Sequence, residues 1–119
     1  MGISSFTQLI VWRKAHEVRR AVYDATETFP ASQAYRLVAQ MQTAAISVPG
    51  NIAEGFGRRH SRDKAKYYTI AKGSADELTD YLIFSREQGY WPNNQKIQSK
   101  LEEVCRMLSR LIELTLGAS

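Results

Sequence analysis

The sequence predicts an all-α fold, an antiparallel up-down-up-down four-helix bundle in a single domain over residues 1–119. Apolar residues recur at steps of three and four along four segments, prolines and glycines separate these segments, and no segment shows the alternation of a strand. At 1.5 Å per residue, segments of about 20 to 27 residues form rods roughly 30 to 40 Å long. Matched lengths and short connections favour antiparallel neighbours.

The first expected helix carries an apolar stripe that ends at Phe29. Pro30 ends this helix, because the proline ring disfavours helical geometry in the residue before it. Ser32 is the expected N-cap of the second helix, which spans about residues 33–56. Gly57 follows this helix, and we expect it to adopt the left-handed conformation of a C-terminal cap.

The third helix is expected to open at Ser61 and to continue to Gly89, with Asp63 in its first turn, where a negative charge suits the helix dipole. The fourth helix is expected after Pro92 and stops before Gly117. The expected core stripes of these two helices are Tyr68, Ala71, Ala75, Leu78 and Leu82, and then Ile97, Leu101, Val104, Leu108 and Leu111.

The second segment contains an uncharged stretch of 17 residues from Leu37 to Ala53. A helix covered on one side normally has a charged outer face. The lack of charge therefore predicts cover on two sides, by a second subunit or, as the alternative, by deep burial within the monomer. The stretch is too short and too polar to span a bilayer. Pro49 interrupts it and predicts a kink near residues 45–49.

The composition argues against several classes of function. Cys105 is the only cysteine, which excludes an internal disulfide and favours a reducing, cytoplasmic compartment. No secretory signal pattern occurs at the N-terminus. The two histidines, His16 and His60, lack the Glu-x-x-His pairing of di-iron bundles, and Cys105 has no recognisable catalytic partners. We therefore predict no enzyme activity, no catalytic residues, no metal, no cofactor and no small-molecule substrate.

A basic segment joins the second and third expected helices. Residues 58–66 hold five positive charges and one negative charge, and the chain as a whole has a net charge of +4. Such density suits contacts with a phosphate backbone, because binding releases condensed counterions; a solvated basic turn is the alternative. The expected nucleic-acid-binding residues are Arg58, Arg59, Arg62, Lys64 and Lys66. Arg13, Lys14, Arg19 and Arg20 of the first helix would enlarge the patch if they lie nearby.

A polar constellation precedes this segment. Asn51, Glu54, Gly55 and Arg58 share one helical face at steps of three, one and three. If the helices form a hairpin about residues 59 and 60, Glu54 lies opposite Arg62. Two interpretations remain open: a polar clasp that holds the hairpin, and a polar site for a ligand or nucleic acid.

Four segments carry a resemblance to a known family. Residues 9–12 (LIVW), 29–30 (FP), 47–55 (SVPGNIAEG, with Arg58) and 70–78 (IAKGSADEL) resemble the four-helix-bundle family of 23S ribosomal RNA intervening-sequence proteins, related to the accessory variability protein of diversity-generating retroelements. The resemblance implies a homopentameric, barrel-like assembly, with nucleic-acid binding by some members through basic surface. By position, the family motif falls on Asn51, Glu54, Gly55, Arg58, Ser74 and Glu77.

The chain departs from the family pattern at four positions in the second helical segment. Ala34 and Arg36 replace an acidic residue and a glycine, and Gln42 and Thr43 stand where basic residues are common. The second helix therefore lacks charge that it would use to bind nucleic acid.

These observations predict a non-enzymatic homo-oligomer, pentameric by resemblance, that binds RNA or DNA through the basic segment and does not enter a membrane. The alternative is a protein–protein assembly or adaptor module without nucleic-acid binding.

Overall fold

The computed structural model describes residues 2–117, and every regular element in this part of the chain is helical. The long helices are α1 (Ile10–Thr26), α2 (Ala39–Phe56), α3 (Ser61–Glu87) and α4 (Gln95–Gly117). Two 3-10 turns, η1 (Phe6–Gln8) and η2 (Ala31–Gln33), and a π-helical turn, η3 (Ala34–Val38), precede α1 and α2. The predicted all-α class is confirmed.

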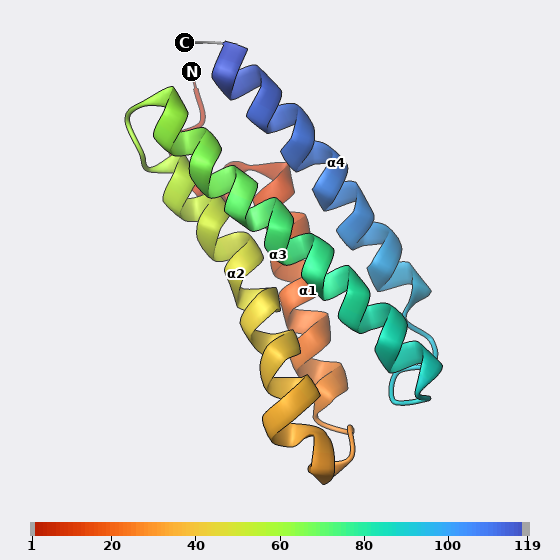
Figure 1. The fold of residues 1–119 in the computed structure, drawn as a ribbon. Coiled ribbons are helices and arrows are strands. Elements are labelled where there is room, and N and C mark those ends of the chain that lie inside the picture. Colours follow the sequence, from red (N-terminus) through yellow and green to blue (C-terminus); the bar gives the residue numbers. More distant parts are fainter. Residues whose placement is uncertain (1, 118–119) are drawn as a thin grey trace.

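The long helices lie side by side in an elongated molecule of 47 × 24 × 21 Å. Each packs against the next along the chain, and α1 also packs against α4. The chain reverses direction at each connection between long helices (Figure 1), which is consistent with the predicted up-down-up-down bundle. The α2–α3 turn, the N-terminal segment and the end of α4 lie at one end of the molecule, and η2, η3 and the end of α3 lie at the other (Figure 1).

The predicted apolar stripes form the core. In α3, Tyr68, Ala71, Ala75, Leu78 and Leu82 are all at most 3% exposed, and the alanines let this helix pack closely against both α2 and α4. The core residues of the other long helices are Val11, Ala15, Val18 and Val22 in α1, Met41, Ala44, Val48 and Ile52 in α2, and Leu101, Val104 and Leu108 in α4. Ile97 and Leu111 pack against this core from partly buried positions.

Two predicted features of the α1–α2 connection are wrong. Helix α1 ends at Thr26 rather than next to Pro30, and Phe29 reaches the core from the following turn. Ser32 lies inside η2 and is not an N-cap; the chain enters α2 through η2 and then η3. A π-helical turn holds one more residue per hydrogen-bonded ring than an α-helix and is frequent at functional sites.

The predicted cap at Gly57 is also wrong, because its φ of −78° is right-handed. The Lys64 ammonium instead donates to the carbonyl oxygens of Phe56 (2.8 Å) and Gly55 (3.4 Å) at the end of α2, where a helix leaves its last carbonyls without an α-helical partner. The Gly55 oxygen also accepts from the Arg58 backbone N–H at 3.2 Å. With these oxygens satisfied, Gly57 need not adopt the left-handed form. In residues 2–117, only Gly89, beyond α3, has a positive φ, of 77°.

Helix α3 does begin at Ser61, although His60 rather than Ser61 occupies its N-cap position. Helix α4 continues through Gly117 instead of stopping before it.

Helix α2 is continuous through Pro49 and presents an uncharged face to solvent. Pro49 itself is buried, and Ile46 is 46% exposed. The alternative of deep burial within the monomer is therefore not observed. We call this surface the uncharged α2 face; its exposed residues are Ala39, Gln40, Thr43, Ile46 and Gly50.

Candidate nucleic-acid interface at the α2–α3 turn

The basic turn, residues 58–66, connects the end of α2 to the first turns of α3 at one end of the bundle (Figure 1). Arg58, Arg59, Arg62 and Lys66 are exposed, whereas Lys64 is partly buried. The structure thus separates the five predicted cations into a surface group and one inward-facing lysine.

Arg58 ties the turn to α3. Its Nη2 donates to Glu54 Oε2 at 2.7 Å and to the Tyr67 hydroxyl at 2.9 Å, and its guanidinium carbon lies 4.7 Å from the centre of the Tyr67 ring. Because both members of the Arg58–Glu54 pair are about half exposed, the pair itself adds little stability. The contacts together orient the guanidinium across the helix junction.

Lys64 has a capping role that the sequence analysis did not predict. Besides its two bonds to the last carbonyls of α2, the ammonium lies 5.5 Å from the Phe56 ring centre. A lysine at this position also complements the negative end of the α2 dipole. Its head group is therefore engaged with α2.

Most of the positive charge of the basic turn that is not paired with another side chain lies on Arg59, Arg62 and Lys66. Within residues 2–117, the side chains of Arg59 and Arg62 have no hydrogen bond or ion pair, and Lys66 lies over the Tyr67 ring at 5.5 Å. Asp63 is the acidic residue of the basic turn, and Glu54 in the last turn of α2 pairs with Arg58. The arrangement leaves a net positive surface that can contact phosphates.

The predicted polar constellation is divided between two sets of contacts. Asn51 Nδ2 donates to the Ser47 carbonyl oxygen (2.8 Å) and to Ser47 Oγ (2.9 Å), and Ser47 Oγ is 2.7 Å from Ser74 Oγ on α3. Glu54 pairs with Arg58 on its own side of the turn rather than with Arg62. Ser47 was missed by the sequence analysis, although it lies one helical turn before Asn51 on the same face.

Gly55 marks a close approach of α2 to α3. A Cβ at this position would lie 2.7 and 2.9 Å from two ring carbons of Tyr68 and 3.1 Å from the Lys64 carbonyl oxygen. Only glycine fits this contact without movement of the neighbouring helix.

Glu77, the last motif residue, lies apart from these contacts. It accepts a hydrogen bond of 2.6 Å from the Tyr81 hydroxyl on its own helix. This bond, together with burial, raises the pKa of Tyr81 to about 12.

Three of the four basic residues of α1 make contacts outside the basic turn, namely Arg13, Lys14 and Arg19. Lys14 pairs with Glu103 of α4 at 2.6 Å, and Arg13 Nε donates to the Thr7 carbonyl oxygen at 2.8 Å. The Arg19 guanidinium is hydrogen-bonded to His16 Nδ1 at 2.8 Å. Arg19 and Arg20 both lie beside Ile46 of α2. Ile46 is roughly 18 Å along α2 from the basic turn at 1.5 Å per residue, so Arg19 and Arg20 do not adjoin the basic turn.

The described residues hold few groups suited to catalysis. Burial and a hydrogen bond to Asp76 raise the pKa of the Cys105 thiol to about 11, which keeps it protonated and unreactive at neutral pH. No group of three or more potential metal ligands occurs in the described part of the chain. Nor is any helix between residues 2 and 117 long and apolar enough to cross a membrane.

The fold and the turn define a class, an all-α protein of four long helices with a cationic helix junction. A family profile described as 23S rRNA-intervening sequence protein matches residues 7–110. Since the match covers most of the chain, the protein belongs to this family. No curated protein sequence matches the chain significantly.

Proposed function

We propose that the protein is a non-enzymatic, cytoplasmic homo-oligomer that binds RNA or DNA through the basic turn. The observation that carries this proposal is the exposure of Arg59, Arg62 and Lys66 at a helix junction where Glu54 is engaged by Arg58. The family description, which names a segment of ribosomal RNA, supports a nucleic-acid partner. Five subunits is the number that the family resemblance suggests.

The contact with nucleic acid is electrostatic and independent of sequence. Arg59 and Arg62 are positioned to meet phosphates, and each contact releases a condensed counterion. Arg58 and Lys64 hold the turn in place through their bonds to Tyr67 and to the end of α2. The affinity should therefore fall steeply as salt is added.

Replacing Arg59 and Arg62 together by glutamine is expected to weaken binding to a DNA duplex roughly tenfold at about 50 mM salt and to reduce the slope of log K against log salt by about 1.8. Fluorescence anisotropy titrations over a range of salt measure both quantities. The matched control is Arg106→Gln with Arg110→Gln, two exposed arginines of α4 that carry the same charge change. Absence of binding by the unmodified protein, or an equal effect of both double variants, would refute the assignment.

The uncharged α2 face supports self-assembly. Gly50 lies on this face in mid-helix, and a Cβ built there meets nothing within 4 Å. Glycine costs about 1 kcal/mol relative to alanine in a helix interior, so packing within the monomer does not explain this residue. A second subunit lying against the face would explain both the missing charge and the missing side chain.

Gly50→Glu is expected to raise the dissociation constant of the assembly roughly tenfold or more, because the carboxylate would be buried without a partner. The monomer should not lose stability, since glutamate favours a helix and has space there. Light scattering over a concentration series measures the mass, with Ser99→Glu on the exposed side of α4 as the control. A monomeric unmodified protein at every concentration would remove this part of the proposal.

A protein–protein assembly or adaptor module is the second candidate. The same uncharged α2 face favours it if the basic turn is only solvated. Protein partners that survive nuclease treatment, together with no salt-dependent binding of RNA or DNA, would favour this alternative.

A further inference from the structure

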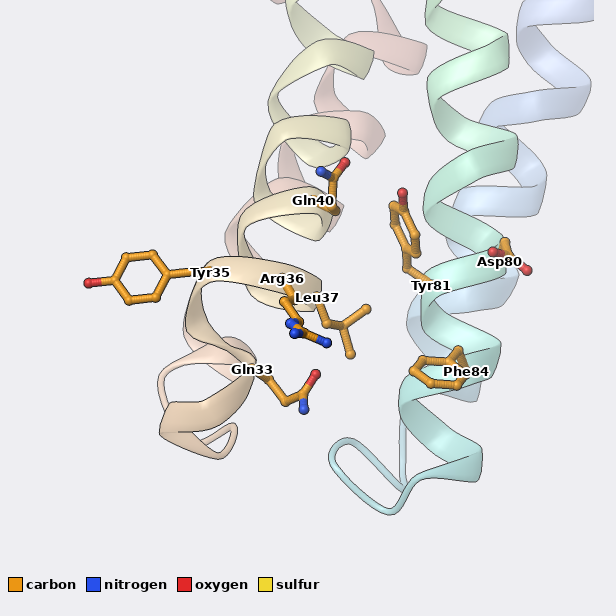
Figure 2. A pocket seen from close by; sticks show the side chains of 8 residues that line it. All are labelled: Gln33, Tyr35, Arg36, Leu37, Gln40, Asp80, Tyr81 and Phe84. Atoms are coloured by element: carbon orange, nitrogen blue, oxygen red, sulfur yellow. The ribbon is translucent and has the colours of Figure 1, made fainter.

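A cleft lies between the start of the second helical segment and the C-terminal half of α3 (Figure 2). These elements meet at the end of the bundle opposite the basic turn (Figure 1). Its volume is about 590 Å³, which lies within the range of small-ligand sites. One wall comes from η2, η3 and the first turn of α2, and the other from α3.

The π-helical turn η3 precedes α2 on one side of this cleft. Gln33 and Arg36 project from this side toward α3, whereas the Tyr35 side chain is directed away from it (Figure 2). Gln40 lies at the other end of the cleft from Gln33, level with Tyr81 (Figure 2). Tyr35 is 95% exposed. The local helix geometry thus directs one amide, of Gln33, and one guanidinium, of Arg36, toward α3.

The opposite wall is aromatic. The hydroxyl of Tyr81 is held by Glu77 at 2.6 Å, and the ring faces the cleft (Figure 2). Phe84 lies one turn further along α3 and is 45% exposed, and the buried Leu37 lies across from it. These side chains form an apolar surface open to solvent, on which a planar ring can stack.

The polar side chains of the cleft are free to form hydrogen bonds with a ligand. Within the described part of the chain, the side chains of Gln33, Arg36 and Gln40 make no hydrogen bond or ion pair. Each amide offers donors and an acceptor, which is the pattern that the edge of a nucleobase presents. A guanidinium can pair with phosphate or stack on a base.

We propose that this cleft binds a single unpaired nucleotide, with its base against Phe84 and Tyr81, its edge toward Gln33, and its phosphate on Arg36. Bases splayed out of single strands are commonly recognised by stacking and by hydrogen bonds to their edges. The base of a duplex stays stacked and does not enter. The nucleotide is free, or it is part of the strand that the basic turn holds, and the second case rests on the proposed function.

Charge near the cleft limits the part of a strand that can lie in it to one nucleotide. Asp80 lies at the rim, with its carboxylate directed away from Arg36 (Figure 2), and Glu77 is one turn before Tyr81. These two carboxylates disfavour a continuous phosphate backbone along the outside of α3. A strand that reached both sites would span about 27 Å from Lys66 to Phe84 at 1.5 Å per residue of helix.

The test compares a single strand of roughly 12 nucleotides with a blunt duplex of the same sequence by fluorescence anisotropy. Phe84→Leu should weaken binding of the single strand roughly tenfold and leave the duplex unchanged, because only the unpaired base stacks on Phe84. Arg36→Gln should lower the salt slope for the single strand by about 0.7. Tyr35→Leu is the matched control, since Tyr35 is exposed beside the cleft but points away, and it should change neither affinity.

The outcomes separate this proposal from the proposed function. If the double variant Arg59→Gln with Arg62→Gln weakens binding of both the single strand and the duplex, while Phe84→Leu binds both as tightly as the unmodified protein, the cleft proposal fails and the proposal for the basic turn stands. An equal loss on single strand and duplex in Phe84→Leu also overturns it. If no strand binds, the proposed function fails, and adenosine and cytidine monophosphates then test the cleft alone. Shifts of the Gln33 side-chain amide signals in NMR spectra support it, and unchanged signals refute it.

Discussion

Asn94→Ala is expected to lower the free energy of unfolding by about 3 kcal/mol, because it removes a fully buried polar side chain that joins α3 to α4. Asn94 Nδ2 donates to the Leu82 carbonyl oxygen at 2.7 Å, and its Oδ1 accepts from Arg86 Nη1 at 2.7 Å. Arg86 Nη1 also donates to Gln98 Oε1 in the first turn of α4. Alanine would leave a buried carbonyl and part of a guanidinium without this partner.

Chemical denaturation with urea, followed by circular dichroism, measures the change in stability. Asn93→Ala is the matched control, because Asn93 is the neighbouring residue of the same type and is exposed. Its effect should lie within about 0.5 kcal/mol of zero. Equal stabilities of the two variants would show that the Asn94 contacts do not hold the α3–α4 connection.

Gly55→Ala is expected to lower the free energy of unfolding by about 2 kcal/mol through overpacking. The new methyl group would lie 2.7 Å from Tyr68 Cε1 and 3.1 Å from the Lys64 carbonyl oxygen, so both a buried ring and a helix backbone must move. The gain of about 1 kcal/mol in helix propensity opposes this cost but does not exceed it. The loss should therefore be visible as a lower urea midpoint.

Gly57→Ala is the control for the Gly55→Ala variant, because it adds a methyl group to the end of α2 without a steric clash. Gly57 is two residues away, has a right-handed φ of −78°, and has no atom nearer to a built Cβ than 3.7 Å. Alanine should be neutral or stabilising there. A double-mutant cycle of Gly55→Ala with Tyr68→Leu should show a smaller loss than the sum of the single losses, since the second change removes the ring that the methyl group meets. Strict additivity would contradict the proposed clash.

The elements could be predicted because their signals are local. The core stripe of α3, such as Leu78 and Leu82, follows from a period of three to four residues, and this period holds wherever the helix packs. The boundaries were less accurate, because caps depend on distant groups. Lys64, on α3, satisfies the carbonyls at the end of α2, and this contact made the left-handed form at Gly57 unnecessary.

The basic residues of the candidate interface could be predicted from the sequence, but the contacts that orient their side chains could not. Charge density along residues 58–66 is visible in the sequence, whereas the inward course of Lys64 and the contact of Arg58 with Tyr67 depend on how α2 and α3 cross. The pairing of Ser47 with Ser74, 27 positions apart, has no local signal. The cleft was not predicted, because its two walls come from separate helical segments.

By itself the sequence determined the helical class, the four apolar stripes, the uncharged second helix and the position of the basic segment, because periodicity and charge are properties of adjacent residues. Only the tertiary structure decided that Gly55 meets Tyr68, that Asn94 is a buried junction and that Phe84 faces Arg36 across a cleft. These contacts depend on the rotation and axial register of each helix, which are set by the packing of all the helices together.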